Sequence, residues 1–274
     1  MTLPSDPQGL EPQGLEPPKI DWQGDIAGRE FEKALGKLRA LAVVGRAEPE
    51  AESAVTRVVD ALEAIRAKNY AGALKTSLEG WEALGLETGS IKPALEALQA
   101  ADANWRNAQT QMRASLETAR GCWLTRSEAE NNLGVLEALV ENASAARAHF
   151  QAALAADPRH YRALTNLGNL ELEAGNLEQA EILYKQVIAI QPEYSVVYNN
   201  LAAAMRKRGK RHESVEYLKK SQRLHMRELR GQTKGTAVGQ APGNQLSKLF
   251  ANPIARWGLA LIAIYLIWRF VLNR

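Results

Sequence analysis

The sequence matches itself at a fixed offset of 34 residues. The offset connects Leu133-Gly134 with Leu167-Gly168 and Leu201-Ala202, Asn132 with Asn166 and Asn200, Phe150 with Tyr184 and Leu218, and Pro158 with Pro192. A fixed period of this size is the signature of a stacked repeat array. The offset therefore predicts a row of helical hairpins, an architecture that serves mainly as a surface for holding other proteins.

Each unit is predicted to contain two helices. In the middle unit, the first helix is expected over 162–174 and the second over 177–190. Gly175-Asn176 separates them, because glycine ends helices in a left-handed conformation at little cost. Pro192 cannot continue the second helix. Small residues alternate with large apolar ones across the hairpin, which lets the two backbones approach closely.

This pattern resembles the tetratricopeptide repeat family. The units are 127–160, 161–194 and 195–228. The first carries the family pattern as Leu133, Gly134, Ala146, Phe150, Ala153 and Pro158, and the second carries it as Leu167, Gly168, Ala180, Tyr184, Val187 and Pro192. The third unit keeps Leu201-Ala202 but departs at Ser214, Leu218, Ser221 and Met226, as a terminal unit that faces water can. The resemblance implies an all-α fold, an α-solenoid of helix-turn-helix repeats.

The sequence divides into five parts. Residues 1–24 contain the pentapeptide Pro-Gln-Gly-Leu-Glu twice and are expected to be a disordered arm. Residues 25–120 are predicted to be helical, and residues 121–230 hold the array. Residues 231–248 are interpreted as a flexible linker. Residues 249–274 are predicted to be a single C-terminal transmembrane helix.

Apolar spacing predicts five helices in the second part, over 26–44, 50–68, 71–84, 94–101 and 104–120. Lys68-Asn69-Tyr70, followed by Ala73-Leu74, resembles the hairpin turn of a degenerate repeat, but a Leu-Gly pair is missing. Whether this part contains true repeats stays open at this point.

The net charge of +3 conceals a division along the chain. Residues 1–205 carry 19 lysine and arginine residues against 28 acidic ones, whereas residues 206–234 carry 11 against 3. The basic segment lies between the array and the predicted anchor. We expect Arg208, Lys210, Arg211, Lys219, Lys220 and Arg223 to lie near anionic lipid, where each cation contributes about 1 kcal/mol. Nucleic acid is the less favoured partner, since few aromatic side chains interleave with these cations.

The anchor hypothesis rests on the segment from Pro253 to Leu272, whose 20 residues would span about 30 Å as a helix. The segment is apolar all round, and tryptophans lie near both ends. The residues assigned to the anchor are Trp257, Leu261, Ile264 and Trp268. More cations precede the segment than follow it, so we expect a single-pass, tail-anchored membrane protein with a cytoplasmic N-terminal domain. The alternatives are a helix that docks on the array or on a partner, and a helix that lies in the plane of the membrane interface.

The resemblance places positions 2, 5, 6, 9, 12 and 13 of each unit on the concave face. An asparagine offers both a donor and an acceptor, so a ladder of asparagines can bind the backbone of an extended segment. The alternative is that these asparagines connect neighbouring helices. The predicted partner-binding residues are Asn131, Asn132, Arg162, Asn166, Asn169, Asn199, Asn200, Arg206 and Lys207, and the cations favour an acidic protein or peptide.

No catalytic or metal-binding pattern is recognisable, and no cofactor is expected. His149 and His160 are predicted to be surface residues, and Cys122, the single cysteine, a small packing residue. We therefore expect a non-enzymatic, membrane-anchored scaffold. The alternatives are an assembly factor or a non-catalytic subunit of a membrane complex.

Overall fold

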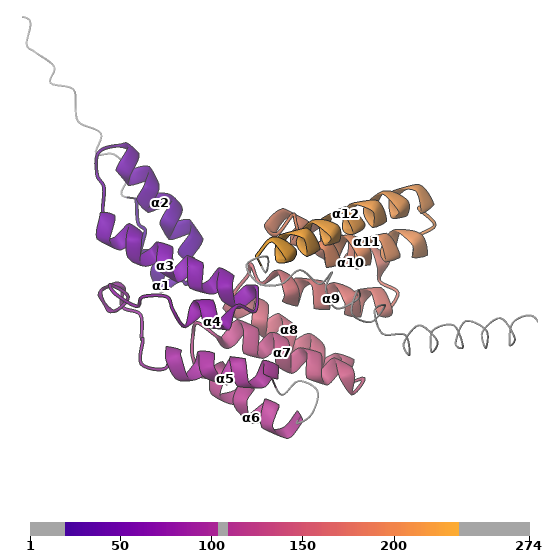
Figure 1. The fold of residues 1–274 in the computed structure, drawn as a ribbon, viewed down its shortest axis with the longest axis horizontal. Helices are drawn as coiled ribbons and strands as arrows, with labels where there is room; N and C mark the ends of the chain where they lie inside the picture. The colour runs from indigo at the N-terminus through magenta and orange to yellow at the C-terminus, as the bar shows by residue number, and fades with distance from the viewer. Residues whose placement is uncertain (1–19, 104–108, 236–274) are drawn as a thin grey trace, which may run out of the picture.

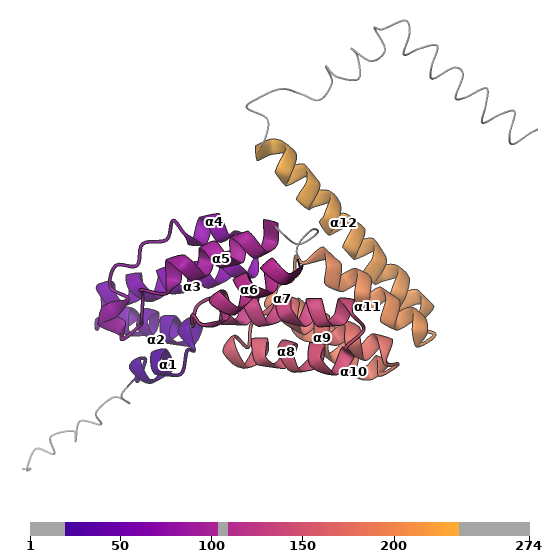
Figure 2. The same cartoon turned by 90° about the horizontal axis from the view of Figure 1, so that it is seen from below.

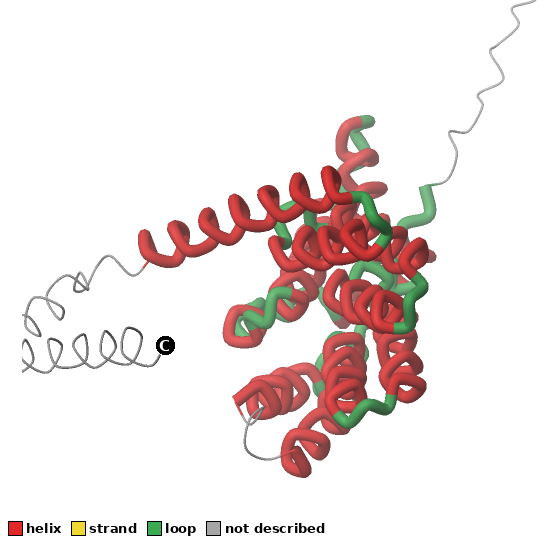
Figure 3. Tube along the Cα trace, turned by 90° about the vertical axis from the view of Figure 1, so that its right-hand side faces the viewer, coloured by secondary structure: helices red, strands yellow, loops and turns green. Residues whose placement is uncertain are grey.

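The computed structural model describes residues 20–103 and 109–235, and these residues form helices, turns and loops without any strand (Figures 1 and 3). The N-terminal block contains α1 (Gln23–Ala27), α2 (Phe31–Val43), α3 (Pro49–Arg66) and the short α4 (Tyr70–Ala73). A 3₁₀ turn at Glu82–Leu84 precedes the hairpin of α5 (Ile91–Ala103) and α6 (Gln109–Arg120).

Three further hairpins follow and form the array. They are α7 (Arg126–Leu139) with α8 (Ala143–Ala156), α9 (Tyr161–Glu173) with α10 (Leu177–Ile190), and α11 (Ser195–Lys207) with α12 (Arg211–Gly235). Each hairpin contacts the next, and α9 also contacts both α7 and α11. The predicted all-α solenoid is confirmed. The helix bounds predicted for the middle unit are also confirmed, to within one residue.

The small-to-large contacts predicted for the hairpins are present. A Cβ atom added at Gly134 would lie 2.6 Å from the ring of Phe150, and one added at Gly168 would lie 2.6 Å from the ring of Tyr184. Both rings are fully buried. The glycines therefore set the close approach between the two helices of each unit.

The turns between the paired helices share one backbone form. The residue two positions before the second helix is left-handed at Glu141 (φ 60°), Gly175 (φ 84°) and Gly209 (φ 78°), which are 34 residues apart. The next residue donates its backbone N–H to the carbonyl five residues earlier, the contact that defines a Schellman motif.

Lys68-Asn69 repeats this turn in the N-terminal block. Lys68 is left-handed with φ 59°, and the N–H of Asn69 donates to the carbonyl of Ala64 at 2.7 Å. The side chain of Asn69 caps α4 by accepting from the N–H of Gly72 at 2.9 Å. The block thus contains the turn of a repeat, whereas α4 ends after a single turn.

Two helix predictions in the N-terminal block are wrong. The predicted helix over 26–44 is interrupted at Gly28-Arg29, where Arg29 is left-handed and the N–H of Glu30 closes the end of α1. The predicted helix over 71–84 ends at Ala73. There the chain turns through a left-handed Gly80, and Trp81 becomes fully buried against Trp123. Burial of a large aromatic ring outweighs local helix propensity at this point.

The boundaries of two other predicted segments also shift. Trp22 is 8% exposed and its Nε1 donates to Glu48 at 3.1 Å, so the described end of the predicted arm, residues 20–24, is part of the fold. Helix α12 continues to Gly235 and occupies the beginning of the predicted linker (Figure 2). The anchor residues Trp257, Leu261, Ile264 and Trp268 lie outside the described residues. Among the helices that the structure does describe, none combines the length and apolar character needed to cross a bilayer.

Candidate protein-binding face

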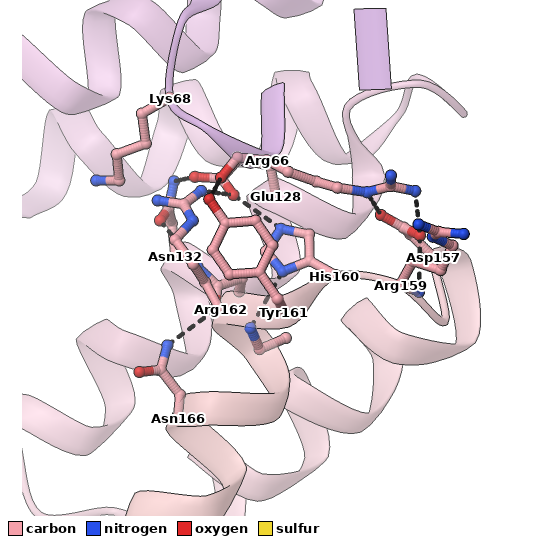
Figure 4. Close-up of polar contacts among 12 residues, drawn as sticks. Arg66, Lys68, Glu128, Asn132, Asp157, Arg159, His160, Tyr161, Arg162 and Asn166 are labelled. Atoms are coloured by element: carbon pink, nitrogen blue, oxygen red, sulfur yellow. Dashed lines mark hydrogen bonds and ion pairs between the residues drawn. The ribbon is translucent and has the colours of Figure 1, made fainter. Parts of the chain in front are cut away.

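A buried polar cluster centred on Glu128 joins the N-terminal block to the first two units (Figure 4). The Glu128 side chain has no exposed surface. Its Oε1 accepts from the hydroxyl of Tyr70 at 2.7 Å and from Nδ2 of Asn132 at 3.1 Å. Its Oε2 contacts Nε2 of His160 at 2.9 Å and the guanidinium of Arg162. Residues from α4, α7 and the start of α9 therefore share one carboxylate.

His160 has a defined role in this cluster. Its Nδ1 accepts the backbone N–H of Ala163 at 3.1 Å, which caps the N-terminus of α9. Because Nδ1 is an acceptor, the ring proton that reaches Glu128 must be on Nε2. The prediction that His160 is a surface residue is wrong, since the side chain is fully buried and makes two specific hydrogen bonds. His149 is half-buried and contacts Glu130 at 2.7 Å.

The charge state of Glu128 follows from these partners. Burial alone raises the pKa of this carboxyl, but the charge of Arg162 and the hydrogen bonds from His160 and Tyr70 outweigh burial. Together they bring the pKa of Glu128 to about 2. Burial, together with the charge of the same carboxylate, raises the pKa of Tyr70 well above its ordinary value. The cluster is therefore a buried carboxylate with its compensating donors.

A second buried ion pair lies beside this cluster. Arg66, at the end of α3, binds Asp157 through Nε at 2.7 Å and Nη2 at 2.8 Å. It also contacts Glu32 at 2.9 Å, and its backbone carbonyl accepts from the hydroxyl of Tyr161. Asp157 lies in the turn between α8 and α9. Arg66 thus connects the N-terminal block to the junction between the first two units through an ion pair and a hydrogen bond.

The asparagines of the array form a ladder between the first helices of successive units. Nδ2 of Asn166 donates to Asn131 at 2.9 Å, and Nδ2 of Asn200 donates to Asn169 at 2.8 Å. Asn169 also accepts from the hydroxyl of Tyr184. These bonds match the alternative reading, in which the asparagines connect neighbouring helices.

Exposure divides the predicted partner-binding residues into three groups. Asn131 and Asn132 are each 3% exposed, so their side chains do not face solvent, and Arg162 is bound to Glu128. Asn166, Asn169 and Asn200 are half-buried, while Asn199, Arg206 and Lys207 are exposed. We name the last six residues the open face. It belongs to the second and third units.

The predicted lipid-proximal cations also differ among themselves. Arg208 binds Glu181 and contacts Glu178 at 3.0 Å, so its charge is already matched within the array. Lys210 has a longer contact with Glu213, and Lys220 lies 5.5 Å from the centre of the Tyr198 ring. Arg211, Lys219 and Arg223 are exposed.

Sequence reasoning missed Tyr70, Glu128 and His160 as members of one cluster. A signal was present: Glu128 and Arg162 are both second residues of their units and have opposite charge. The contribution of Tyr70 was not visible, because it depends on how the N-terminal block docks. Cys122 is buried as predicted. Within the described residues, no three His, Cys, Asp or Glu side chains are placed to hold a metal ion.

Comparison with known families supports the repeat assignment. Two models described as tetratricopeptide repeat match residues 133–195 and 196–225. These residues make up about a third of the chain and include most of the three hairpins from α7 to α12. Residues 133–225 of the array therefore match the tetratricopeptide repeat. A search of curated proteins found no match.

Among solved structures, the chain is similar to several described as MamA. One has 20% identity and a TM-score of 0.42, with 61% of this chain and 95% of that chain covered. Another has 22% identity and a TM-score of 0.41, with 64% and 93% covered. A third, MamA MSR-1 C2, has 17% identity and a TM-score of 0.39, with 64% and 98% covered. A likeness at this level says nothing about the partners of this chain.

Proposed function

We propose that the protein is a non-enzymatic scaffold that holds a protein or peptide through the open face of its second and third units. The observation that carries this proposal is the contrast between the units. The polar row of the first unit, Glu128, Asn131 and Asn132, is buried, and Tyr70 of α4 donates to Glu128. In contrast, Asn199, Arg206 and Lys207 on α11 are exposed. Their amide and cationic groups remain available for a partner.

The charges of this face favour an acidic partner. Arg206 and Lys207 are neighbours at the end of α11, and within the described residues neither has a carboxylate partner. Lys207 donates only to the carbonyl of Leu172, at 3.2 Å. A backbone contact of this kind leaves the charge uncompensated, so a carboxylate on the partner would complete the site.

We further propose that this scaffold is anchored in a membrane by residues 249–274, with the array on the cytoplasmic side. Support comes from the apolar segment with its flanking tryptophans and from the exposed cations Arg211, Lys219 and Arg223 on the preceding helix. The alternative, an assembly factor or non-catalytic subunit whose C-terminal helix docks on a partner, shares the open face but not the anchor.

The open face is tested with a charge-reversed variant of the full chain, Asn199→Ala with Arg206→Glu and Lys207→Glu. All three residues are exposed, so we expect the fold to persist. Affinity purification from solubilised membranes should lose the main partner by about tenfold or more. The matched control, Arg211→Glu with Lys219→Glu, should retain it. Equal recovery with both variants would refute the proposed face.

The anchor is tested by comparing the full chain with a chain that ends at Gln245. We expect the full chain to need detergent for extraction and the shortened chain to need none. If the shortened chain still floats with anionic liposomes but not with neutral ones, the basic residues bind lipid as proposed. Extraction of the full chain without detergent would favour the assembly factor.

A further inference from the structure

A cleft lies between the N-terminal block and the array. Its volume is about 660 Å³. Its walls come from the start of α2, from the segment before α7 and from the turn between α8 and α9. The aromatic side chains of Phe31 and Trp123 line it, and so do Arg29, Arg126 and Arg159. It is distinct from the open face, which lies on α9 and α11.

The arginines in this cleft differ in whether a nearby carboxylate neutralises their charge. Every acid that lines it already contacts a cation: Glu30 binds Lys33, Asp157 binds Arg66, and Glu32 contacts both Arg66 and Arg159. Arg29 and Arg126 have no carboxylate partner among the described residues. Arg126 donates only to the carbonyl of Arg120, at 3.2 Å.

Arg29 is held in position by an aromatic ring. Its guanidinium lies 4.4 Å from the centre of the Trp123 ring, and Nε1 of Trp123 donates to the carbonyl of Glu87 at 2.7 Å. Burial and the nearby charge of Arg126 lower the pKa of Arg29. Stacking on a ring fixes the guanidinium plane and leaves its N–H donors free at the edge. A carboxylate placed between Arg29 and Arg126 would relieve their repulsion.

Arg29 also borders a second, smaller cavity of about 330 Å³. Trp22, Ile26, Leu84 and Leu86 line this cavity. Arg29 thus lines two cavities, and both have apolar and aromatic residues in their walls. A ligand suited to both cavities would offer apolar side chains to these walls and a carboxylate to Arg29.

The chain contains a segment with this chemistry, residues 1–19. It holds five prolines, and the pentapeptide at Pro7–Glu11 and Pro12–Glu16 places a leucine before a glutamate each time. Its three acids outnumber its single lysine. Prolines favour the extended polyproline conformation, which aromatic-lined grooves bind at a low entropic cost. Only ten positions separate Lys19 from Arg29, so the tether gives the segment a high effective concentration at the cleft.

We propose that the cleft between the N-terminal block and the array is a binding site for a proline-rich acidic segment, and that residues 1–19 of the same chain occupy it. Glu11 or Glu16 binds between Arg29 and Arg126, and the adjacent leucine packs on the apolar wall. Any partner that carries a similar segment would have to displace this arm.

The test uses the full chain with Gln13→Cys, labelled with a thiol-reactive dye. The native Cys122 is 1% exposed and should not compete for the dye. Fluorescence anisotropy should lie well above that of a labelled synthetic peptide of residues 1–19. It should fall most of the way to the peptide value in Arg29→Glu with Arg126→Glu, and in 1 M salt, which screens charges beyond about 3 Å. The control Lys75→Glu with Lys92→Glu, two exposed cations outside every proposed site, should leave it unchanged.

Exchanging the charges of the arm and the cleft separates loss of binding from loss of folding. Glu11→Lys with Glu16→Lys should also lower the anisotropy, and adding the two cleft substitutions to that chain should restore it. The arm substitutions leave the sequence of residues 20–235 unchanged. Anisotropy equal to that of the peptide in the unsubstituted cleft would overturn the proposal. A signal that falls on dilution would overturn the intramolecular assignment, because it would place the arm of a second copy in the cleft.

Discussion

At the scale of single residues, the same repeat position carries different roles in successive units. Position 2 is Glu128 in the first unit and Arg162 in the second, and the two side chains bind each other inside the protein. In the third unit the position is Val196, which is 45% exposed. The family resemblance assigns position 2 to a binding face. In the first two units, however, the side chains at this position bind each other instead of a partner.

Glu128→Gln should destabilise the protein at neutral pH by about 3 kcal/mol, because it leaves Arg162 without its counter-charge. The folded-state pKa of Glu128 is about 2, below the ordinary value of 4.5. Its contribution to stability is therefore complete above about pH 4.5 and disappears as the pH falls towards 2. Denaturant unfolding of both chains between pH 7 and pH 3 measures this difference.

Glu117→Gln is the matched control for this measurement, since Glu117 is 59% exposed and pairs with an exposed Arg120. We expect it to change the unfolding free energy by less than about 0.5 kcal/mol. A difference between Glu128→Gln and the unsubstituted protein that stays constant down to pH 3 would contradict the assigned charge state.

Gly168→Ala should destabilise by about 1–3 kcal/mol, because the added methyl would lie 2.6 Å from the buried ring of Tyr184. For Gly36→Ala we expect the opposite change in stability. Gly36 is on an exposed face of α2 with open space around it, so alanine should stabilise by about 0.5–1 kcal/mol. Thermal unfolding of the two variants should shift in opposite directions, and a shared direction would refute the close-approach role of Gly168.

At the scale of helices, the repeat period predicted the array well and the N-terminal block only in part. Helices α9 and α10 begin and end within a residue of their predicted bounds, since glycine, proline and apolar spacing all indicate the same boundaries. The break at Arg29 and the early end of α4 were not predicted. Both depend on tertiary burial, of Trp81 above all, which local propensity does not contain.

The candidate binding face was likewise predicted only in part from the sequence. Sequence reasoning identified the asparagine row but could not tell which members are buried. Asn132 shares the carboxylate of Glu128 with Tyr70, which lies 58 positions earlier in the sequence. The alternative, asparagines that connect helices, matches the observed bonds of Asn166 and Asn200. A partner-binding role for the open face stays a prediction.

Arg66→Ala should loosen the contact between the N-terminal block and the array, because it leaves the carboxylate of Asp157 buried without its partner. Hydrogen exchange of the amides in α2 and α3 should become about 100-fold faster, as a loss of about 3 kcal/mol implies, while α10 and α11 keep their protection. Arg113→Ala, which removes a partly exposed pair with Glu137, is the control. Uniform acceleration throughout the chain would show that the block is not a separate unit of stability.

At the scale of the whole molecule, the two ends of the array differ. The first unit is covered by the N-terminal block through Glu128 and Arg66, whereas the third unit ends in the long α12, which extends beyond α11 (Figure 2). Cations gather on this second end, and acids predominate before it. This polarity supports the proposal that a partner is held on the second and third units, close to a membrane.

The most direct test of the scaffold proposal is site-specific photo-crosslinking of the full chain in its own cells. A benzophenone amino acid replaces Asn199, on the open face, or Ile182, which is 50% exposed on the second helix of its unit. The proposal predicts a discrete protein adduct from position 199, reduced by Arg206→Glu with Lys207→Glu, and none from position 182. Equal adducts from both positions, or an adduct from 182 alone, would contradict it.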